Sequence, residues 1–348
     1  MNEQHIINDI RKSIRLETPS RVPCLPLGTD FDVWQGKYSH KEYRTRSDVM
    51  IETGLNAIDK FNYDWFILFP DDLLEWEHCG IEVTDEEFIP PAVKRYLEPS
   101  IETLKHLRLP SPSKDGRMPF FLEGLKGLRR EAGNRVCIAG RIAAPFTAVT
   151  LLLGIEPVIF LMLENPILLE KFMDYVSECN TVWAQAQLEA GADILWLGDC
   201  VATSKFISAH DYMKFAAEAA DRDSKMVRKL GGIVFYHGSE TSIPHLKAMA
   251  DLSFDAINIG ETADSGEVKK AIGKQKCIMG NLDTINVLQN GTMEHVEHEV
   301  SKLLEAAMPG GGYIFCTGEG IPHNTKPENV RKMTDTVHKH GIYKRNIK

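Results

Sequence analysis

The chain has 348 residues and a net charge of −9, from 40 Lys and Arg against 49 Asp and Glu. Hydrophobic residues make up 43% of it and charged residues 26%, which is ordinary globular usage and excludes a disordered or fibrous chain. An acidic chain without a basic block binds nucleic acid and anionic membrane surfaces poorly, so we expect no partner of either kind.

The N-terminus and the cysteines predict a cytoplasmic protein. The N-terminal segment 1–21 has no apolar stretch of the kind found in signal peptides. The most apolar segment, 146–169, contains Glu156, Pro157 and Glu164, which a membrane span would not tolerate. The seven cysteines are widely spaced and form no CxxC motif, which favours reduced thiols over a disulfide framework.

Short apolar runs alternate along the chain with longer amphipathic stretches. The runs are rich in β-branched or aromatic residues and are bounded by Gly, Asp or Asn, which is typical of buried parallel strands. The stretches carry helix signals, such as the capping box of Thr325 and Glu328 with Pro327 in the first turn. In chain order, the predicted strands are 23–26, 65–69, 136–139, 194–197, 233–236, 256–259, 277–279 and 313–316.

Eight strands alternating with helices predict a (β/α)8 TIM barrel, with a doubly wound sheet as the alternative. No linker or repeat divides the chain, so we expect one domain over residues 1–348. We expect an N-terminal helical elaboration over about residues 1–20, with both terminal segments packed outside the barrel.

In such a barrel, the chemistry lies just after the carboxyl end of each strand. Many of the residues at these positions are acidic, and one is a histidine. Like carboxylates repel one another unless protons or a cation are present, so their accumulation at one mouth indicates a functional site. In chain order, these residues are Asp71, Asp72, Gly140, Arg141, Asp199, Cys200, His237, Ser239, Glu240, Glu261, Asn281, Asp283 and Glu319.

The C-terminal third carries segments that resemble the uroporphyrinogen decarboxylase superfamily. These are FYHGSETSIPHLKAM, FDAINIG, IMGNLD and GYIFCTGEGIPHNTKPENVRKM, and the run GEGIPHNTKPENV is the most specific of them. Earlier segments, including PFTAVTLLLG and FPDDLLEWEHCG, fit the same pattern, so the resemblance covers residues 20–342. The superfamily has a (β/α)8 barrel, in agreement with the strand count.

The resemblance separates into two branches. The decarboxylases carry an N-terminal arginine-containing segment that binds substrate carboxylates, and here that region reads PCLPLGTDFDVW. Their Gly-His-Gly-Ile histidine corresponds to Glu319 and their loop tyrosine to Leu151, although Asp71 matches the aspartate that holds the pyrrole nitrogens. A polycarboxylate substrate without those arginines would be repelled by an acidic protein.

The other branch is that of the corrinoid-dependent methyltransferases. Those that methylate coenzyme M bind zinc through a His-x-Cys motif and a Gly-Cys-Gly-Ile motif. Here His237 matches the histidine, whereas Ser239 and Glu319 replace the two cysteines. An oxygen-rich zinc is a harder Lewis acid that suits a departing ether oxygen better than a thiol. The predicted zinc ligands are His237, Glu240, Glu261 and Glu319, with Cys316 as a weaker candidate.

The resemblance therefore implies a methyltransferase that moves a methyl group from a small donor, such as a methoxylated aromatic, to a corrinoid. The chain has no Asp-x-His-x-x-Gly segment, so we expect the cobalamin on a separate partner protein. The alternatives are a methylcorrinoid:thiol methyltransferase, a uroporphyrinogen decarboxylase, and a non-catalytic tetrapyrrole- or corrinoid-binding module. Asp199 and Glu319 are the predicted catalytic residues, and the predicted substrate-binding residues are Asp71, Asp72, Trp65 and Asn281, with Trp34 and Trp76 as further pocket candidates.

Overall fold

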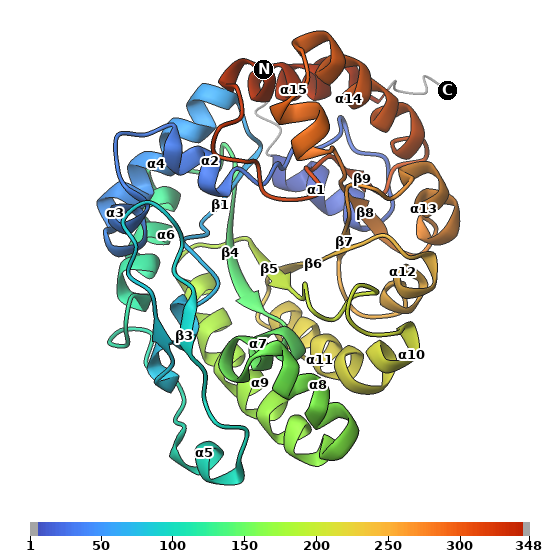
Figure 1. Ribbon diagram of the computed structural model, residues 1–348. Coiled ribbons are helices and arrows are strands. Elements are labelled where there is room, and N and C mark those ends of the chain that lie inside the picture. Colours follow the sequence, from blue (N-terminus) through green and yellow to red (C-terminus); the bar gives the residue numbers. More distant parts are fainter. Residues whose placement is uncertain (1–5, 344–348) are drawn as a thin grey trace.

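The computed structural model describes residues 6–343 and shows an α/β fold built on a curled, all-parallel sheet of seven strands. Helices surround the sheet on its outer side (Figure 1). The strand order is β1-β4-β5-β6-β7-β8-β9, so each strand pairs with the next one along the chain. The bounds are β1 (Trp65–Ile67), β4 (Cys137–Ala143), β5 (Ile194–Gly198), β6 (Ile233–Glu240), β7 (Ala256–Ile259), β8 (Cys277–Met279) and β9 (Tyr313–Ile314).

The helices follow the strands as expected for βα units, and a small excursion separates β1 from β4. This excursion contains η1 (Leu74–Cys79), the hairpin β2 (Glu82–Val83) and β3 (Val93–Arg95), and α5 (Ile101–His106). The helices before it are α1 (Ile6–Ile14), α2 (Thr29–Trp34), α3 (His40–Thr45) and α4 (Ser47–Phe61). Those after it are α6 (Met118–Ala132), α7 (Pro145–Leu153), α8 (Ile155–Glu164), α9 (Pro166–Glu189), α10 (Ala209–Asp211), η2 (Tyr212–Ala216), α11 (Ala217–Lys229), α12 (Ile243–Ala250), α13 (Ser265–Ile272), η3 (Thr284–Gln289), α14 (Met293–Ala307) and α15 (Pro327–His340).

The prediction of an eight-stranded barrel is confirmed in part, because the first predicted strand is not a strand of the sheet. Residues 23–26 lie between β9 and β1, where Cys24 makes one parallel bridge to Phe315 and its carbonyl accepts a hydrogen bond from the Asp64 amide. Pro23 and Pro26 have no N–H group, so this segment cannot form a regular ladder. Seven of the eight predicted strands do pair in order, and the doubly wound alternative is excluded.

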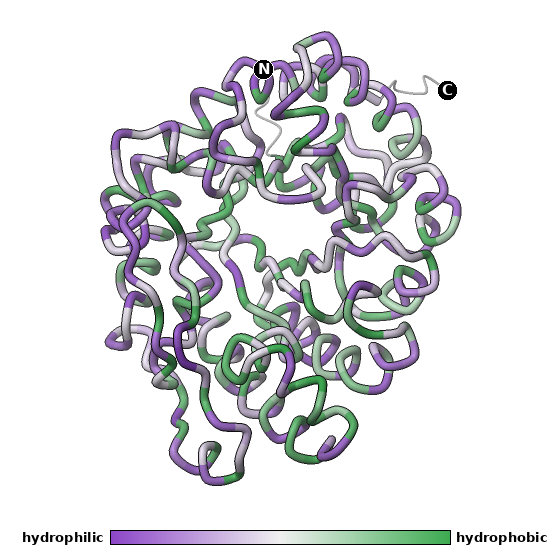
Figure 2. The backbone as a smooth tube through the Cα atoms, viewed as in Figure 1, coloured by the Kyte–Doolittle hydropathy of each residue, from purple (hydrophilic) through white to green (hydrophobic). Residues whose placement is uncertain are grey.

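Two hydrophobic clusters explain why the chain folds this way. In the strands, alternate residues point inward, and Trp65, Trp196 and Phe235 belong to the inner cluster. The residues between them point outward into a larger cluster shared with the helices. Figure 2 shows hydrophobic residues along the central strands and polar residues on the outer helices.

The expectation that the N-terminal segment packs outside is wrong for α1. Ile6 and Ile10 are buried in the inner cluster. The chain that follows α1 lies against Gly311 and Gly312, just before β9 begins, so α1 covers the amino-terminal end of the sheet interior. The C-terminal helix α15 packs on the outside against α14 and α4, as expected.

No single helix among residues 6–343 is long and apolar enough to cross a membrane. One strongly bent pair, α7 with α8, passes the test of length and composition only.

Candidate functional site

The inward positions of neighbouring strands place four polar or aromatic side chains near the carboxyl end of the sheet. Arg141 of β4 is the register partner of Trp196 of β5, and His237 of β6 is the partner of Asn258 of β7. All four side chains are almost fully buried. The period of two along each strand therefore aims them into the same space.

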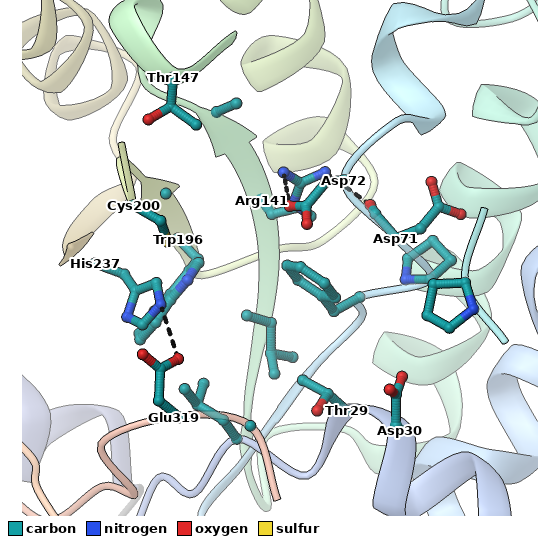
Figure 3. A pocket seen from close by; sticks show the side chains of 18 of the residues that line it. Thr29, Asp30, Asp71, Asp72, Arg141, Thr147, Trp196, Cys200, His237 and Glu319 are labelled. Atoms are coloured by element: carbon teal, nitrogen blue, oxygen red, sulfur yellow. Dashed lines mark hydrogen bonds and ion pairs between the residues drawn. The ribbon is translucent and has the colours of Figure 1, made fainter. Parts of the chain in front are cut away.

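Above these residues lies a cavity of about 440 Å³, at the mouth formed by the loops that follow the strands. Its size suits a small organic ligand. Figure 3 shows His237 and Glu319 on one wall and Arg141, Asp71 and Asp72 on the opposite wall. The cavity is lined by Leu27, Thr29, Asp30, Ile67, Phe69, Pro70, Asp71, Asp72, Pro90, Pro91, Arg141, Ala143, Thr147, Leu151, Trp196, Gly198, Cys200, Val201, His237, Glu319 and Gly320.

The imidazole of His237 is held in a defined orientation. Its Nδ1 is 2.8 Å from the Oδ1 atom of Asn258, and the Asn258 amide nitrogen is 3.4 Å from the Thr317 carbonyl oxygen. The amide oxygen therefore accepts the Nδ1 proton, and the lone pair of Nε2 faces the cavity. Nε2 lies 3.8 Å from the half-exposed Glu319 carboxylate and 3.4 Å from the Ser239 hydroxyl.

Burial lowers the pKa of His237 below its usual value. The charges of Glu319 and Asp72 and the hydrogen bond with Asn258 act in the opposite direction but do not outweigh it. The ring is therefore neutral at pH 7. The pair of His237 and Glu319 is the reactive feature of this wall.

The predicted tryptophan of the site, Trp65, lies below the cavity and not in its lining. It is fully buried, and its indole N–H donates to the Pro26 carbonyl at 2.8 Å. The ring that lines the cavity is Trp196, which packs on the His237 ring at 4.8 Å and on Trp65 at 5.8 Å. Of the other two tryptophans considered, Trp76 is buried in the outer core and Trp34 packs on His323 at the surface.

A network of buried ion pairs forms the wall opposite His237. The Arg141 guanidinium donates to the Asp71 carbonyl and to Glu75 at 2.8 Å each, and to Asp72 at 3.0 Å. Burial raises the pKa of Glu75 to about 7, although Arg141 acts to lower it. The guanidinium also stacks over the Phe69 ring at 4.8 Å, so the protein itself binds both terminal nitrogens and one face of the Arg141 guanidinium, while its buried Nε has no partner.

Asp71 and Asp72, the two carboxylates predicted to bind substrate, both line the cavity, but they differ in availability to a ligand. Asp71 is buried and accepts two hydrogen bonds from Arg117, at 2.5 and 3.0 Å, and one from the Leu73 amide. Burial alone would raise the pKa of Asp71, but Arg117 outweighs it and holds the pKa below the usual range. The more exposed Asp72 is the carboxylate that can meet a ligand.

Asp199, predicted to be catalytic, is buried behind the cavity wall. Its carboxylate accepts hydrogen bonds from the hydroxyls of Thr147 and Tyr236, both at 2.7 Å. Burial raises the pKa of Asp199 to about 6 against these two bonds. Asp199 does not line the cavity, whereas Thr147 does. The structure therefore indicates that Asp199 positions the Thr147 side chain.

Three of the five predicted zinc ligands are not brought to the cavity. Glu240 lies on the outward side of β6, beyond a bulge, and Glu261 binds the Thr284 amide at 2.8 Å and hydroxyl at 2.5 Å. Cys316 belongs to the inner core, where burial raises its thiol pKa. Asn281, predicted to bind substrate, instead donates to the carbonyls of Gly260 and Ala263 beside Glu261.

The predicted zinc site is therefore not assembled as expected. Residues 6–343 contain no group of three His, Cys, Asp or Glu side chains arranged to hold a metal. Of the five candidates, only His237 and Glu319 face each other in the cavity. Catalytic zinc takes three protein ligands, so this donor set does not fit it, and we derive no step through zinc.

Glu240 offers a test of its structural role. Its carboxylate accepts hydrogen bonds from the Ser204 amide and hydroxyl and from the amides of Thr241 and Ser242, at 2.6–2.8 Å. We expect Glu240→Ala to lower the free energy of unfolding by about 2–3 kcal/mol, because four donors lose a charged acceptor. Urea denaturation measures the loss. The exposed Glu178→Ala on α9 is the control, and an equal effect of both variants would contradict the assignment.

Strand-end reasoning did not select Trp196, Asn258 or Thr147 for the site. Trp196 and Asn258 lie inside strands, so a search for residues after strands passes over them. The signal in the sequence was the alternation: Ile194 and Trp196, or Ala256 and Asn258, share one face of their strands.

The chain belongs to the uroporphyrinogen decarboxylase (URO-D) family, whose sequence model matches residues 8–340. Uroporphyrinogen decarboxylases of Methylococcus capsulatus and Anaeromyxobacter dehalogenans are 25% and 26% identical to it, covering 84% and 88% of this chain and 84% and 89% of theirs. A methyltransferase from Methanosarcina mazei has a similar fold, with a TM-score of 0.84, 22% identity, and coverage of 94% of this chain and 96% of that one. The family indicates that the chain is an enzyme, and the neighbour shows that the fold is shared.

Proposed function

We propose that this protein transfers a methyl group from a small methylated donor to the cobalt of a corrinoid held by a separate protein. The observation that carries the proposal is the small cavity at the open end of the sheet, with the His237–Glu319 pair on its wall and an aromatic floor. The similarity of fold to a methyltransferase supports it. Such an enzyme holds the donor in the cavity while the corrinoid approaches the mouth.

In the reaction, the carbon–donor bond breaks and its electron pair stays with the departing atom, while a reduced cobalt supplies the pair for the new bond to carbon. This chain's own residues bind the donor, exclude water and control the proton. If the donor is a methyl ether, the departing oxygen needs a proton. The protonated His237 imidazole, at the cavity wall, is the group placed to give it.

Decarboxylation of uroporphyrinogen is the alternative that the names of the relatives suggest. The charge of the cavity argues against decarboxylation of this substrate. Among residues 6–343, Arg141 is the one Lys or Arg side chain that lines the cavity, and Glu75 and Asp72 already bind it. A substrate with several carboxylates would meet Asp30, Asp72 and Glu319 without compensation. Conversion of uroporphyrinogen by the purified protein would favour this alternative.

The test is a methyl-transfer assay with the purified protein, cob(I)alamin and a panel of donors that includes methoxylated aromatics and methylated amines. Consumption of cob(I)alamin that depends on both protein and donor supports the proposal. The assay is repeated with Glu319→Gln and with the exposed control Glu178→Gln. If no donor in the panel methylates cob(I)alamin, or if a polycarboxylate is decarboxylated instead, the proposal is wrong.

The pH dependence separates the two directions of transfer. Because burial lowers the pKa of His237, the protonated imidazole accumulates only at pH values below the usual pKa of histidine. With an ether donor, we expect kcat/KM to rise as pH falls through this pKa. Glu319→Gln should move the profile to lower pH, since the Glu319 charge raises the His237 pKa. In the other direction, transfer to a thiol acceptor needs neutral His237 as a base. The rate of that transfer would therefore fall as pH falls through the His237 pKa.

A further inference from the structure

The charge of the cavity bears on the chemical class of the methyl donor. In the described part of the chain, four carboxylates line the cavity, on Asp30, Asp71, Asp72 and Glu319, against the single guanidinium of Arg141. Arg117 neutralises Asp71 from behind, but Arg117 also binds Glu77 at 2.6 Å. The buried Glu75 shares the charge of Arg141 with Asp72, so the lining is negative as a whole.

The three remaining carboxylates are open to a ligand. Asp30 has the imidazole of His40 at 3.7 Å, and Glu319 has the neutral His237 at 3.8 Å. Asp72 keeps one oxygen on Arg141, and its side chain is 61% exposed. The side chains of Asp30 and Glu319 are 47% and 46% exposed. These groups stand around the cavity on different segments, Asp30 in the first turn of α2 and Asp72 and Glu319 in loops, and they surround a bound molecule with negative charge.

Two groups of the wall, Cys200 and His237, report this negative field. Burial raises the pKa of the Cys200 thiol, and Asp72 and Glu319 raise it further, while Arg141 opposes them. Asp72 and Glu319 also act to raise the pKa of His237. Lys205, in the loop after β5, acts in the opposite direction on His237 but less strongly than either carboxylate.

The charge of the departing group must be compatible with this negative field. Unless His237 protonates it, an ether leaves as an alkoxide or phenoxide, an anion that would form next to Glu319 and Asp72, and burial disfavours the protonated form of His237. No group of three metal ligands is present among residues 6–343 to stabilise it. A methylated onium cation behaves in the opposite way, because its departing group is neutral. Its positive charge is stabilised by the carboxylates before the reaction and needs no proton during it.

We infer that the methyl donor is a small quaternary ammonium cation, held by Asp30, Asp72 and Glu319 over the aromatic floor of Trp196. This inference rests on the proposed function. In the reaction, the N–CH3 bond breaks and the electron pair remains on nitrogen as a neutral tertiary amine. The methyl group is taken by the reduced cobalt of the corrinoid, which supplies the bonding pair and is oxidised from Co(I) to Co(III).

Binding tests the inference without the methyl-transfer reaction. The probes are choline and its neutral isostere 3,3-dimethylbutan-1-ol, in which carbon replaces the cationic nitrogen. We expect choline to bind at least about tenfold more tightly in calorimetry at low salt, a difference of about 1.4 kcal/mol. Its affinity should fall with added salt, because the carboxylates are half-exposed. Equal affinities for the two probes, or no binding of choline, would overturn the inference.

Variants locate the cation. Asp72→Asn and Glu319→Gln should each weaken choline binding by about fivefold to tenfold and leave the neutral isostere unchanged. Glu178→Gln, on the exposed face of α9, should change neither. Thermal unfolding checks that each variant is folded. If the two cavity variants bind choline as well as wild type, the assigned carboxylates are wrong.

The methyl-transfer assay separates the two proposals. Methyl transfer from choline or tetramethylammonium to cob(I)alamin supports both. Transfer from methoxylated aromatics alone, with no choline binding, overturns the cationic donor and leaves the proposed function standing. Choline binding without methyl transfer from any donor overturns the proposed function, but it leaves the assignment of a negatively charged, cation-binding cavity unchanged.

Discussion

Replacing His237 with alanine is expected to lower kcat/KM for methyl transfer by about 100-fold or more when the donor is an ether. The imidazole is the group at the cavity wall that can give a proton to a departing oxygen, and Asn258 holds it in place at 2.8 Å. With a cationic donor, the loss should be about tenfold, because the ring then only supports Trp196 and the neighbouring Glu319. Steady-state rates with cob(I)alamin measure both.

His237→Gln is the matched control. Glutamine can donate to Asn258 but cannot carry the proton, so it should restore part of the rate with a cationic donor and none with an ether. Circular dichroism establishes that both variants keep the fold, as expected for a residue at the carboxyl end of β6. Wild-type turnover by His237→Ala with every donor that the enzyme uses would show that the site is elsewhere.

Replacing Arg141 with methionine is expected to lower the free energy of unfolding by about 3–5 kcal/mol. The side chains of Arg141 and Glu75 are 4% and 2% exposed and meet at 2.8 Å. Methionine leaves Glu75 buried without its partner, and the Asp71 carbonyl loses its donor. Urea denaturation followed by circular dichroism measures the change.

The loss of unfolding free energy in Arg141→Met should depend on pH. The pKa of Glu75 is already raised to about 7, and without Arg141 it rises further. A carboxyl whose pKa is raised in the folded state contributes stability at low pH and loses it as pH rises through that pKa. The deficit of Arg141→Met should therefore be larger at about pH 8 than at about pH 5. Adding Glu75→Gln should recover part of it at the higher pH, and a deficit independent of pH would contradict the assignment.

Much of the fold could be predicted from the sequence, because periodicity and strand length carry that information. Seven of the eight predicted strands pair in the predicted order. Two features were not predicted, for physical reasons. The prolines at 23 and 26 limit the first segment to isolated contacts. The placement of α1 depends on tertiary packing, because an amphipathic helix does not itself indicate which apolar surface it covers.

The site was predicted less completely. Position after a strand correctly selected Asp71, Asp72 and Glu319 as cavity residues, and His237 reached the cavity from within β6. The same rule failed for Glu240, which ends β6 on its outward side, and for Glu261 in the loop after β7, because both carboxylates turn away to cap backbone amides. Such local hydrogen bonding depends on loop geometry that sequence spacing does not determine. Trp65 was misassigned because Trp65 and Trp196 differ mainly in depth along their strands.

The aromatic floor of the cavity has a consequence for how this enzyme can change. Trp196 forms the floor and packs on Trp65 below the cavity, and Trp65 packs on Phe235, so the floor rests on side chains from three strands of the sheet. A substitution there disturbs neighbouring strands as well as the cavity. The walls at 27–30, where α2 begins, and in the loops at 90–91 and 319–320 belong to segments that can vary one at a time. New donor preferences should therefore arise by exchange of these segments over an unchanged base, and directed evolution of the protein would gain most from libraries confined to those three segments.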